Sequence, residues 1–177
     1  MKFFSANLVF AVVVFFSVNA QYENSALKVG QKAPELAYAN PDGKTLQLSE
    51  INKGRFVLIH FWASWTGPGR IVNPAILRMY KDFSAKKFKG AKNGFTILSF
   101  SLDSKKEAWV AAIHKDNLVW PYHMSDLNPV QWKSAVVSSY GVQFLPQAFL
   151  VDPKGVIVGK YQRPDEAEAD LGKFVMQ

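Results

Sequence analysis

Two nearly continuous apolar runs dominate the pattern of hydrophobic and polar positions along the chain. Residues 56–62 and 95–102 are too short for globular helices and are rich in β-branched and aromatic side chains, which indicates strands buried on both faces of a sheet. Between the runs, four apolar residues recur at helical spacing: Ile71, Ile76, Tyr80 and Phe83. Strand, helix and strand of these lengths predict a right-handed βαβ unit with parallel strands.

The residues before this unit predict a β-hairpin. A short strand at 36–38 leads to the turn-forming residues 41–43, and the alternation over 45–48 predicts the return strand. Ser49 is then expected to cap a single helical turn over 50–52.

The residues after the unit continue with further helices and strands. Ser104 and Glu107 have the spacing of a capping box, which predicts that a helix begins there. Pro121 lies in an apolar stretch at 119–122, and because proline is tolerated best in edge strands, a short strand is expected there at the edge of the sheet. A further helix is expected over 129–139.

The last third of the chain predicts a hairpin and a helix. Residues 147–151 and 156–161 flank a turn that contains proline and glycine at compatible positions. Pro164 is expected to start a final helix that contains Leu171, Phe174 and Val175. No repeat or linker interrupts the pattern, so we expect one domain over residues 27–177.

The first residues have the pattern of a secretory signal peptide. Lys2 supplies a positive charge, residues 8–16 are apolar, and residues 18–20 form a cleavage site. We therefore expect residues 1–20 to be a signal peptide, residues 21–26 to be a polar leader, and the protein to be periplasmic or secreted, with no stable membrane insertion after cleavage. Anchoring in the inner membrane by an uncleaved signal is the alternative. It is disfavoured because the apolar stretch is shorter than the ~20 residues of a spanning helix.

The composition removes one class of chemistry. The chain has 177 residues, is 49% hydrophobic and contains no cysteine. Thiol–disulfide exchange, peroxide reduction by a thiol and thiolate metal sites all require a thiolate, so they are excluded. No metal site is expected from the remaining ligand types either, because no convincing ligand spacing relates His114 and His123 to Asp103 or Asp126.

The formal net charge is +7, and much of the excess lies in a lysine cluster comprising Lys81, Lys86, Lys87, Lys89 and Lys92. A solvated C-terminal end of the first long helix, where the helix dipole favours cations, explains this cluster better than a nucleic-acid surface. We therefore expect no nucleic-acid partner.

The turn after the first buried run carries the clearest functional signal. Residues 64–69 connect a predicted strand to a predicted helix, where backbone N–H groups of the first helical turn are unpaired. The sequence W-A-S-W-T-G-P-G-R around it resembles the active-site turn W-A-x-W-C-G-P-C-R of thioredoxin-fold oxidoreductases. Thr66 and Gly69 stand where the two cysteines would be.

The resemblance covers nearly all of the chain after the leader. K-V-G-Q-K-A-P-E-L, G-K-T-L-Q-L-S-E, F-W-A-S-W, S-L-D-S-K-K-E-A-W, S-S-Y-G-V-Q-F-L-P and F-L-V-D-P-K-G-V-I-V-G-K occur in the order seen in extracytoplasmic thioredoxin-like proteins of the TlpA/ResA type. These proteins overlap the redoxin and AhpC/TSA superfamily. The resemblance implies an α/β thioredoxin fold: a central mixed sheet with helices on both faces, an N-terminal hairpin extension and a central insert over residues 99–126.

The resemblance also assigns expectations to single positions. Leu145–Pro146 matches the family's cis-proline, which faces the CxxC turn and helps to bind extended substrate chains. His60 falls where relatives carry a buried Asp or Asn beneath the dithiol, and a neutral core histidine is expected there. Val72 stands where many relatives have a glutamate that assists proton transfer.

Three functional hypotheses follow. The first is a redox-inactive module, without a cofactor, that binds a protein or an extended peptide in a groove formed by Trp65, Thr66, Gly67, Pro68, Gly69, Leu145 and Pro146. In it, Thr66 is an N-cap and Pro68 lies in the first helical turn. The second is a structural subunit of an envelope assembly. The third is an enzyme with Thr66 as nucleophile and His60 as base, which lacks an evident orienting carboxylate. The oligomeric state is not indicated by the sequence.

Overall fold

The computed structural model describes residues 26–176, so the predicted signal peptide and most of the predicted leader lie outside the described residues. Seven strands form one mixed sheet in the order β2-β1-β5-β4-β3-β6-β7. The strands are β1 Ala37–Ala39, β2 Thr45–Gln47, β3 Phe56–Trp62, β4 Phe95–Ser101, β5 Tyr122–Ser125, β6 Gln147–Val151 and β7 Ile157–Tyr161. The helices are α1 Leu48–Ile51, α2 Gly67–Ile71, α3 Asn73–Phe83, α4 Lys106–Lys115, α5 Ala135–Tyr140 and α6 Ala167–Gly172, with short 3-10 helices η1 Gln131–Lys133 and η2 Pro164–Glu166.

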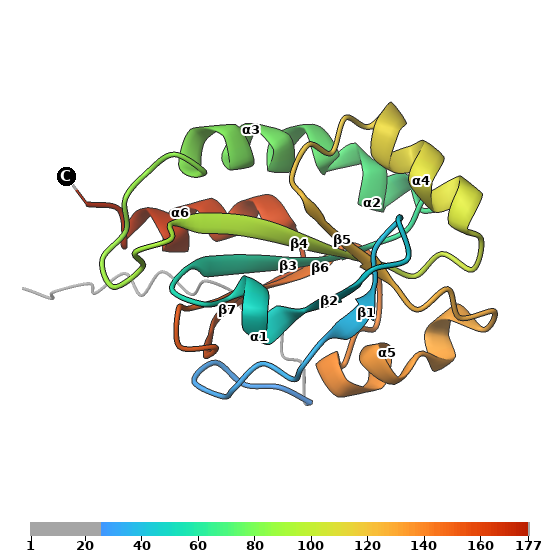
Figure 1. Cartoon of the computed structure of the whole chain (residues 1–177), viewed down its shortest axis with the longest axis horizontal. Helices are drawn as coiled ribbons and strands as arrows, with labels where there is room; N and C mark the ends of the chain where they lie inside the picture. The colour runs from blue at the N-terminus through green and yellow to red at the C-terminus, as the bar shows by residue number, and fades with distance from the viewer. Residues whose placement is uncertain (1–25, 177) are drawn as a thin grey trace, which may run out of the picture.

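The predicted βαβ unit is confirmed and lies at the centre of the sheet. Strand β3 pairs in parallel with β4 and antiparallel with β6, and every residue of β3 and β4 is buried. Alternate residues of β3 enter two separate hydrophobic clusters: Phe56, Leu58 and Trp62 on one face, and Val57, Ile59 and Phe61 on the other. Helices α3, α4 and α6 cover the first face, whereas α1 and α5 cover the second (Figure 1).

The predicted helix after the turn is broken. It consists of α2 and α3, which meet at Val72, and Ile71 is 79% exposed instead of contributing to the core. Pro74 explains the break, because proline lacks the N–H that would bond the carbonyl four residues earlier and its ring clashes with that carbonyl. The expected lysine cluster is also displaced: Lys81 lies in the last turn of α3, but Lys86 and the lysines after it follow the end of that helix.

The prediction of an edge strand at 119–122 is wrong both in its residues and in its place in the sheet. Strand β5 begins after this proline, at Tyr122, and it is an internal strand between β1 and β4. The reason is a long-range one: β1 pairs with β5 through Ala39 and Ser125, so the N-terminal hairpin extends the sheet beyond β5.

The predicted helix caps are mostly wrong. The N-caps of α1 and α4 are Gln47 and Lys105, and neither receives a side-chain capping bond, so Ser49 and the Ser104–Glu107 pair do not cap. The expected helix over 129–139 is η1 followed by α5, whose N-cap Ser134 accepts a hydrogen bond from the Val136 N–H.

The expected final helix is also divided. It consists of η2 and α6, with Phe174 and Val175 beyond its end.

A polar cluster is enclosed in the core between β3, β4 and β5. His60 and His123 are buried, and Ser99 lies between His60 and the side chain of Trp120. The Trp120 indole N–H donates to Ser99 Oγ at 2.9 Å, and His60 Nδ1 lies 3.4 Å from the same oxygen. His123 Nε2 lies 2.8 Å from the backbone oxygen of Trp120.

Burial keeps both imidazoles neutral. It lowers the pKa of His60 to about 3, with a smaller contribution from the charge that a protonated His123 would carry. Burial also lowers the pKa of His123 to about 4, against backbone hydrogen bonds to Trp120 and Leu118 that raise it. Both histidines therefore take up protons more readily in the unfolded chain, where their pKa is about 6.5.

We predict that acid destabilises the fold through these two residues. A histidine whose pKa is depressed in the fold takes up its proton on unfolding. The free energy of unfolding should therefore decrease as the pH falls below ~6.5, down to about 4 for His123 and about 3 for His60. Urea unfolding at several pH values measures this slope. His60→Gln and His123→Gln should each flatten it, with His114→Gln, at an exposed histidine, as the control substitution. Equal slopes for all variants would contradict the assignment.

Candidate functional site

The turn that resembles a dithiol site joins the end of β3 to α2. Thr66 is the N-cap of α2 and Pro68 lies in its first turn, as expected. The Thr66 hydroxyl does not cap, however, and donates instead to the backbone oxygen of Ala63 at 3.0 Å. This bond folds the turn back toward the end of β3.

Thr66 and Gly69 lie against each other across the first turn of α2. A Cβ atom placed on Gly69 would overlap Oγ1 of Thr66 and lie 3.4 Å from the Cβ of that residue. Disulfide-bonded cysteines have Cβ atoms about 3.5–4.5 Å apart. The backbone therefore keeps the spacing of a disulfide, although neither position carries sulfur.

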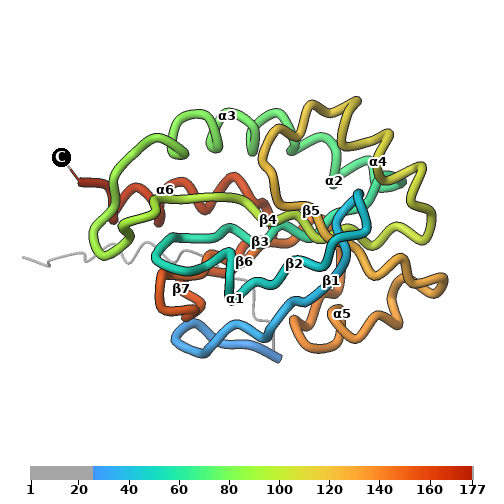
Figure 2. The backbone as a smooth tube through the Cα atoms, viewed as in Figure 1, coloured from blue at the N-terminus to red at the C-terminus, as the bar shows by residue number. Residues whose placement is uncertain are grey.

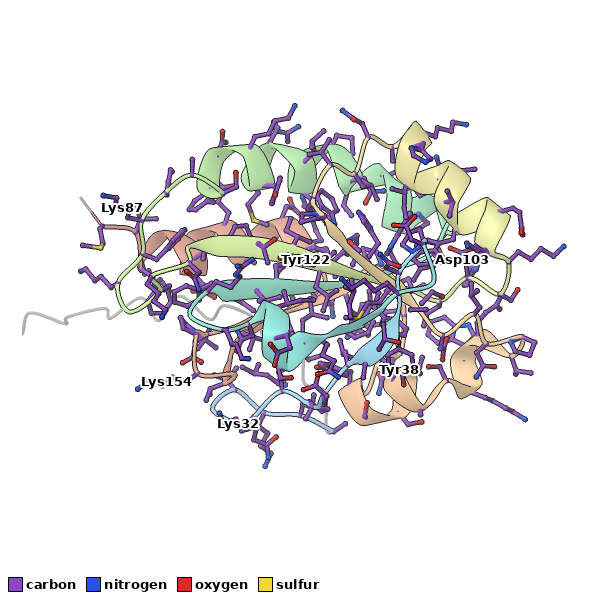
Figure 3. All side chains as sticks on the ribbon, in the orientation of Figure 1. Lys32, Tyr38, Lys87, Asp103, Tyr122 and Lys154 are labelled. Carbon is purple, nitrogen blue, oxygen red and sulfur yellow. The ribbon has the colours of Figure 1, made fainter. Side chains whose placement is uncertain are left out.

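A buried carboxylate holds the start of the turn. Asp103, just after β4, accepts the Ser64 backbone N–H at 2.9 Å, the Ser64 hydroxyl at 2.5 Å and the Ser101 hydroxyl at 2.6 Å. Its side chain lies at the end of the sheet shown to the right in Figure 3. Because β3 and β4 run parallel, their C-terminal ends meet at this edge, and Asp103 bonds across them.

A second polar network holds the junction of α2 and α3. Asp116, the C-cap of α4, accepts hydrogen bonds from Nε and Nη2 of the Arg70 guanidinium. It also accepts one from the side-chain amide of Asn73, at 2.8 Å. The Arg70 hydrogen bonds lower the pKa of Asp116, with a further contribution from Asn73. These bonds hold the junction between α2 and α3, where Pro74 interrupts the helix, against the end of α4.

The expected groove residues differ in exposure. Trp65 is 47% exposed, Gly67 and Pro68 are exposed, and Gly69 is buried. Thr66 is half-buried, and Leu145 and Pro146 are buried and joined by a cis peptide bond. They directly precede β6, whose first residue Gln147 pairs with Phe61 near the end of β3. The register therefore brings both segments to the same end of the sheet.

The structure does not assemble the expected nucleophile and base. His60 is fully buried and faces Ser99, whereas the Thr66 hydroxyl is bonded to Ala63. With a pKa of about 3, His60 is also a weak base. Val72, where relatives have a glutamate, is half-buried and packs against the core.

No group of three or more His, Asp or Glu side chains in residues 26–176 is arranged to hold a metal ion. The residues that we considered as ligands have other contacts: Asp103 holds the turn, Asp126 accepts the Asn128 N–H at 3.2 Å, and His123 contacts backbone carbonyl groups. Among the described residues, no helix is long and apolar enough to cross a membrane.

Sequence reasoning missed the two carboxylates that hold the turn. The sequence pattern relates Asp103 only to a possible metal site and assigns no role to Asp116. A signal for Asp103 was present, since an acidic residue at the end of a strand parallel to β3 must lie beside the turn. Asp116 has no comparable local signal, because its partners lie 43 to 46 positions away in the sequence.

Comparison with solved structures agrees with the predicted thioredoxin fold. The thioredoxin domain of a thiol-disulfide oxidoreductase from Bacteroides vulgatus is 31% identical with a TM-score of 0.71, and the match covers 85% of this chain and 99% of that one. The C-terminal domain of a putative thiol-disulfide oxidoreductase from Bacteroides thetaiotaomicron is 26% identical with a TM-score of 0.72, covering 84% and 97%.

Sequence relatives point the same way. Thiol-disulfide oxidoreductase ResA of Bacillus cereus is 24% identical over 155 residues, which are 86% of this chain and 82% of the relative. The thioredoxin-like protein YneN of Bacillus subtilis is 29% identical over 132 residues, covering 74% and 69%. The model of the Redoxin family matches residues 28–174. The chain therefore belongs to the Redoxin family and is related to thiol-disulfide oxidoreductases of the ResA type.

Proposed function

We propose that this protein is a redox-inactive thioredoxin-like protein of the cell envelope that binds a protein or an extended peptide. The observation that carries the proposal is the pairing of Thr66 with Gly69 at the two cysteine positions of the turn, in a chain without cysteine. The chemistry named for its relatives requires a thiolate. A hydroxyl bonded to Ala63 and a glycine supply none.

The support for binding is the rigidity and exposure of the same face. Asp103 and Asp116 hold the turn on both sides. The turn presents Trp65, 47% exposed, and the end of α2 presents Ile71, 79% exposed. Exposed aromatic residues on a preorganised surface are typical of binding hot spots, because little conformational entropy is lost when a partner covers them.

The support for an envelope location is the N-terminal sequence. Residues 1–20 have the charge, apolar stretch and small residues of a signal peptide. The fold tolerates an oxidising compartment without further adaptation, since there is no thiol to oxidise.

The purified protein should not reduce insulin disulfides and should not consume hydroperoxide with any thiol donor. The physical reason is the lack of a thiolate, which both reactions require. Turbidity of reduced insulin and peroxide consumption measure the two reactions. Activity above that of a buffer blank, if it remains after trace contaminants have been removed, would contradict redox inactivity.

Thr66→Cys combined with Gly69→Cys should form a disulfide. The double change removes the Thr66 oxygen that a side chain at 69 would overlap, and the Cβ separation of 3.4 Å is close to that of disulfides. Thiol titration before and after reduction measures closure, and Thr66→Cys alone is the control that keeps a free thiol. Catalysis by the double variant should stay poor, because Val72 cannot transfer protons. A cysteine pair that stays reduced under oxidising conditions would show that the turn does not keep residues 66 and 69 at the spacing of a disulfide.

Trp65→Ala should weaken binding of an extended chain about tenfold, as expected for an aromatic hot spot. A fluorophore-labelled extended peptide without acidic side chains is a suitable probe, and anisotropy reports its binding. Val119→Ala is the matched control, because Val119 is 50% exposed and lies outside the turn. Unchanged binding by Trp65→Ala with the native unfolding curve would show that this face does not bind extended chains and would favour a structural subunit.

A further inference from the structure

The end of the sheet away from the turn is hollowed and basic. Two concavities of about 340 and 540 Å³ lie there and share Pro153 and Lys154, from the turn between β6 and β7. We call them together the basic trough. Its walls come from three further segments, at 32–35, 48–54 and 88–92. Figure 2 shows these loops gathered at one end of the backbone, and Figure 3 places Lys32 and Lys154 there, far from Asp103.

Positive charge dominates the trough. Four lysines line it, namely Lys32, Lys53, Lys92 and Lys154, against the single carboxylate of Glu35. All four lysines are exposed. Only Lys53 forms an ion pair among the described residues of this set, with Glu50.

The carboxylate of Asp152, beside Pro153, bonds within its own turn. Asp152 accepts the backbone N–H groups of Lys154 and Val156 at 2.8 and 2.9 Å, so it stabilises the turn itself. The Lys32 ammonium donates to the backbone oxygen of Lys154, which holds two lysines of the trough in neighbouring positions.

The loops that carry these lysines are bonded to one another. Buried Asn52 donates to the backbone oxygens of Arg55 at 2.9 Å and Asp152 at 2.8 Å. Asn93 donates from its side chain to the Lys53 oxygen at 2.7 Å and from its backbone to the Gly54 oxygen at 2.8 Å. The like charges are therefore held together in the folded chain. A concave surface lined by charges of one sign focuses their field and attracts an anionic partner.

The floor of the trough is partly apolar. Phe88 and Ala91, both largely buried, line the larger concavity together with Lys92 and Lys154, and Pro153 lines both concavities. A concave surface with an apolar floor and a cationic rim complements a chain that carries both apolar and acidic side chains. Its concavity is a poor match for a flat bilayer.

We propose that the basic trough binds an acidic segment of a partner protein in extended conformation, with apolar side chains over the Phe88 floor and carboxylates beside the trough lysines. In an extended segment successive side chains point to opposite sides, about 3.3 Å apart along the chain, so an alternating sequence presents one chemistry to each side. The site shares no residue with the turn that contains Thr66. Its success or failure is therefore independent of the function proposed above.

The test uses a fluorescein-labelled peptide that alternates glutamate and leucine over about twelve residues, with binding followed by anisotropy. Lys92→Glu combined with Lys154→Glu should weaken binding at least about tenfold, because both contacts become repulsive. Lys44→Glu combined with Lys105→Glu changes the net charge equally at exposed lysines outside the trough and should bind nearly as well as the unchanged protein. The affinity of the unchanged protein should also fall as NaCl is raised from about 0.05 to about 0.5 M.

Three results would overturn the proposal. One is equal loss in the two double variants, which would show that only net charge matters. Another is equally tight binding of a peptide that alternates glutamate and serine, which would remove the role of the apolar floor. The third is binding to vesicles containing phosphatidylglycerol, or to oligothymidylate, in preference to the peptide. Urea unfolding of both double variants verifies that each remains folded.

Discussion

The double pairing of β3 is the constraint on which the rest of the structure depends. With β4 on one side and β6 on the other, β3 has no free edge, and its side chains alternate between the two hydrophobic clusters. A slip of one residue would exchange the side chains between the two faces. The register thus determines where the strand ends, and with it the position of the turn, of Asp103 and of the Leu145–Pro146 segment.

The same constraint explains why the scaffold of a thiol site can persist without thiols. Asp103 and Asp116 sit in bonded networks, and removing one member would leave buried or half-buried polar groups without a partner. The side chains at 66 and 69 are not members of these networks. The Thr66 hydroxyl donates to the nearby backbone oxygen of Ala63, and Gly69 has no side chain. The fold therefore loses little when threonine and glycine stand at the two cysteine positions. Stability alone is a sufficient reason for the supporting residues, so their presence is not by itself a sign of catalysis.

The sequence predicted the parts of this molecule that local pattern determines. The runs that became β3 and β4, the hairpin β6–β7 and the turn with Thr66 and Gly69 all have short-range signals. The break at Val72 also has a local signal, because Pro74 excludes a continuous helix, although the helical spacing of Ile71 with Ile76 indicates the opposite. The place of β5 was not within reach, since it depends on the pairing of Ala39 with Ser125. The basic trough is likewise a product of loops from four parts of the chain, which no window of sequence brings together.

The two ends of the sheet differ in the kind of recognition that they can offer. The turn presents aromatic and aliphatic side chains, whereas the trough places lysines around an apolar floor. The buried strands β3 and β4 separate these ends, so a partner at one end does not cover the residues of the other. Substitutions at one end can consequently change its ligand without unfolding the domain or disturbing the opposite end. For the binding module that we propose, such independence would allow two protein segments to bind at the same time. If both proposed surfaces bind, a partner that carries both ligand segments on one chain should bind more tightly than either segment alone, because its second contact is intramolecular.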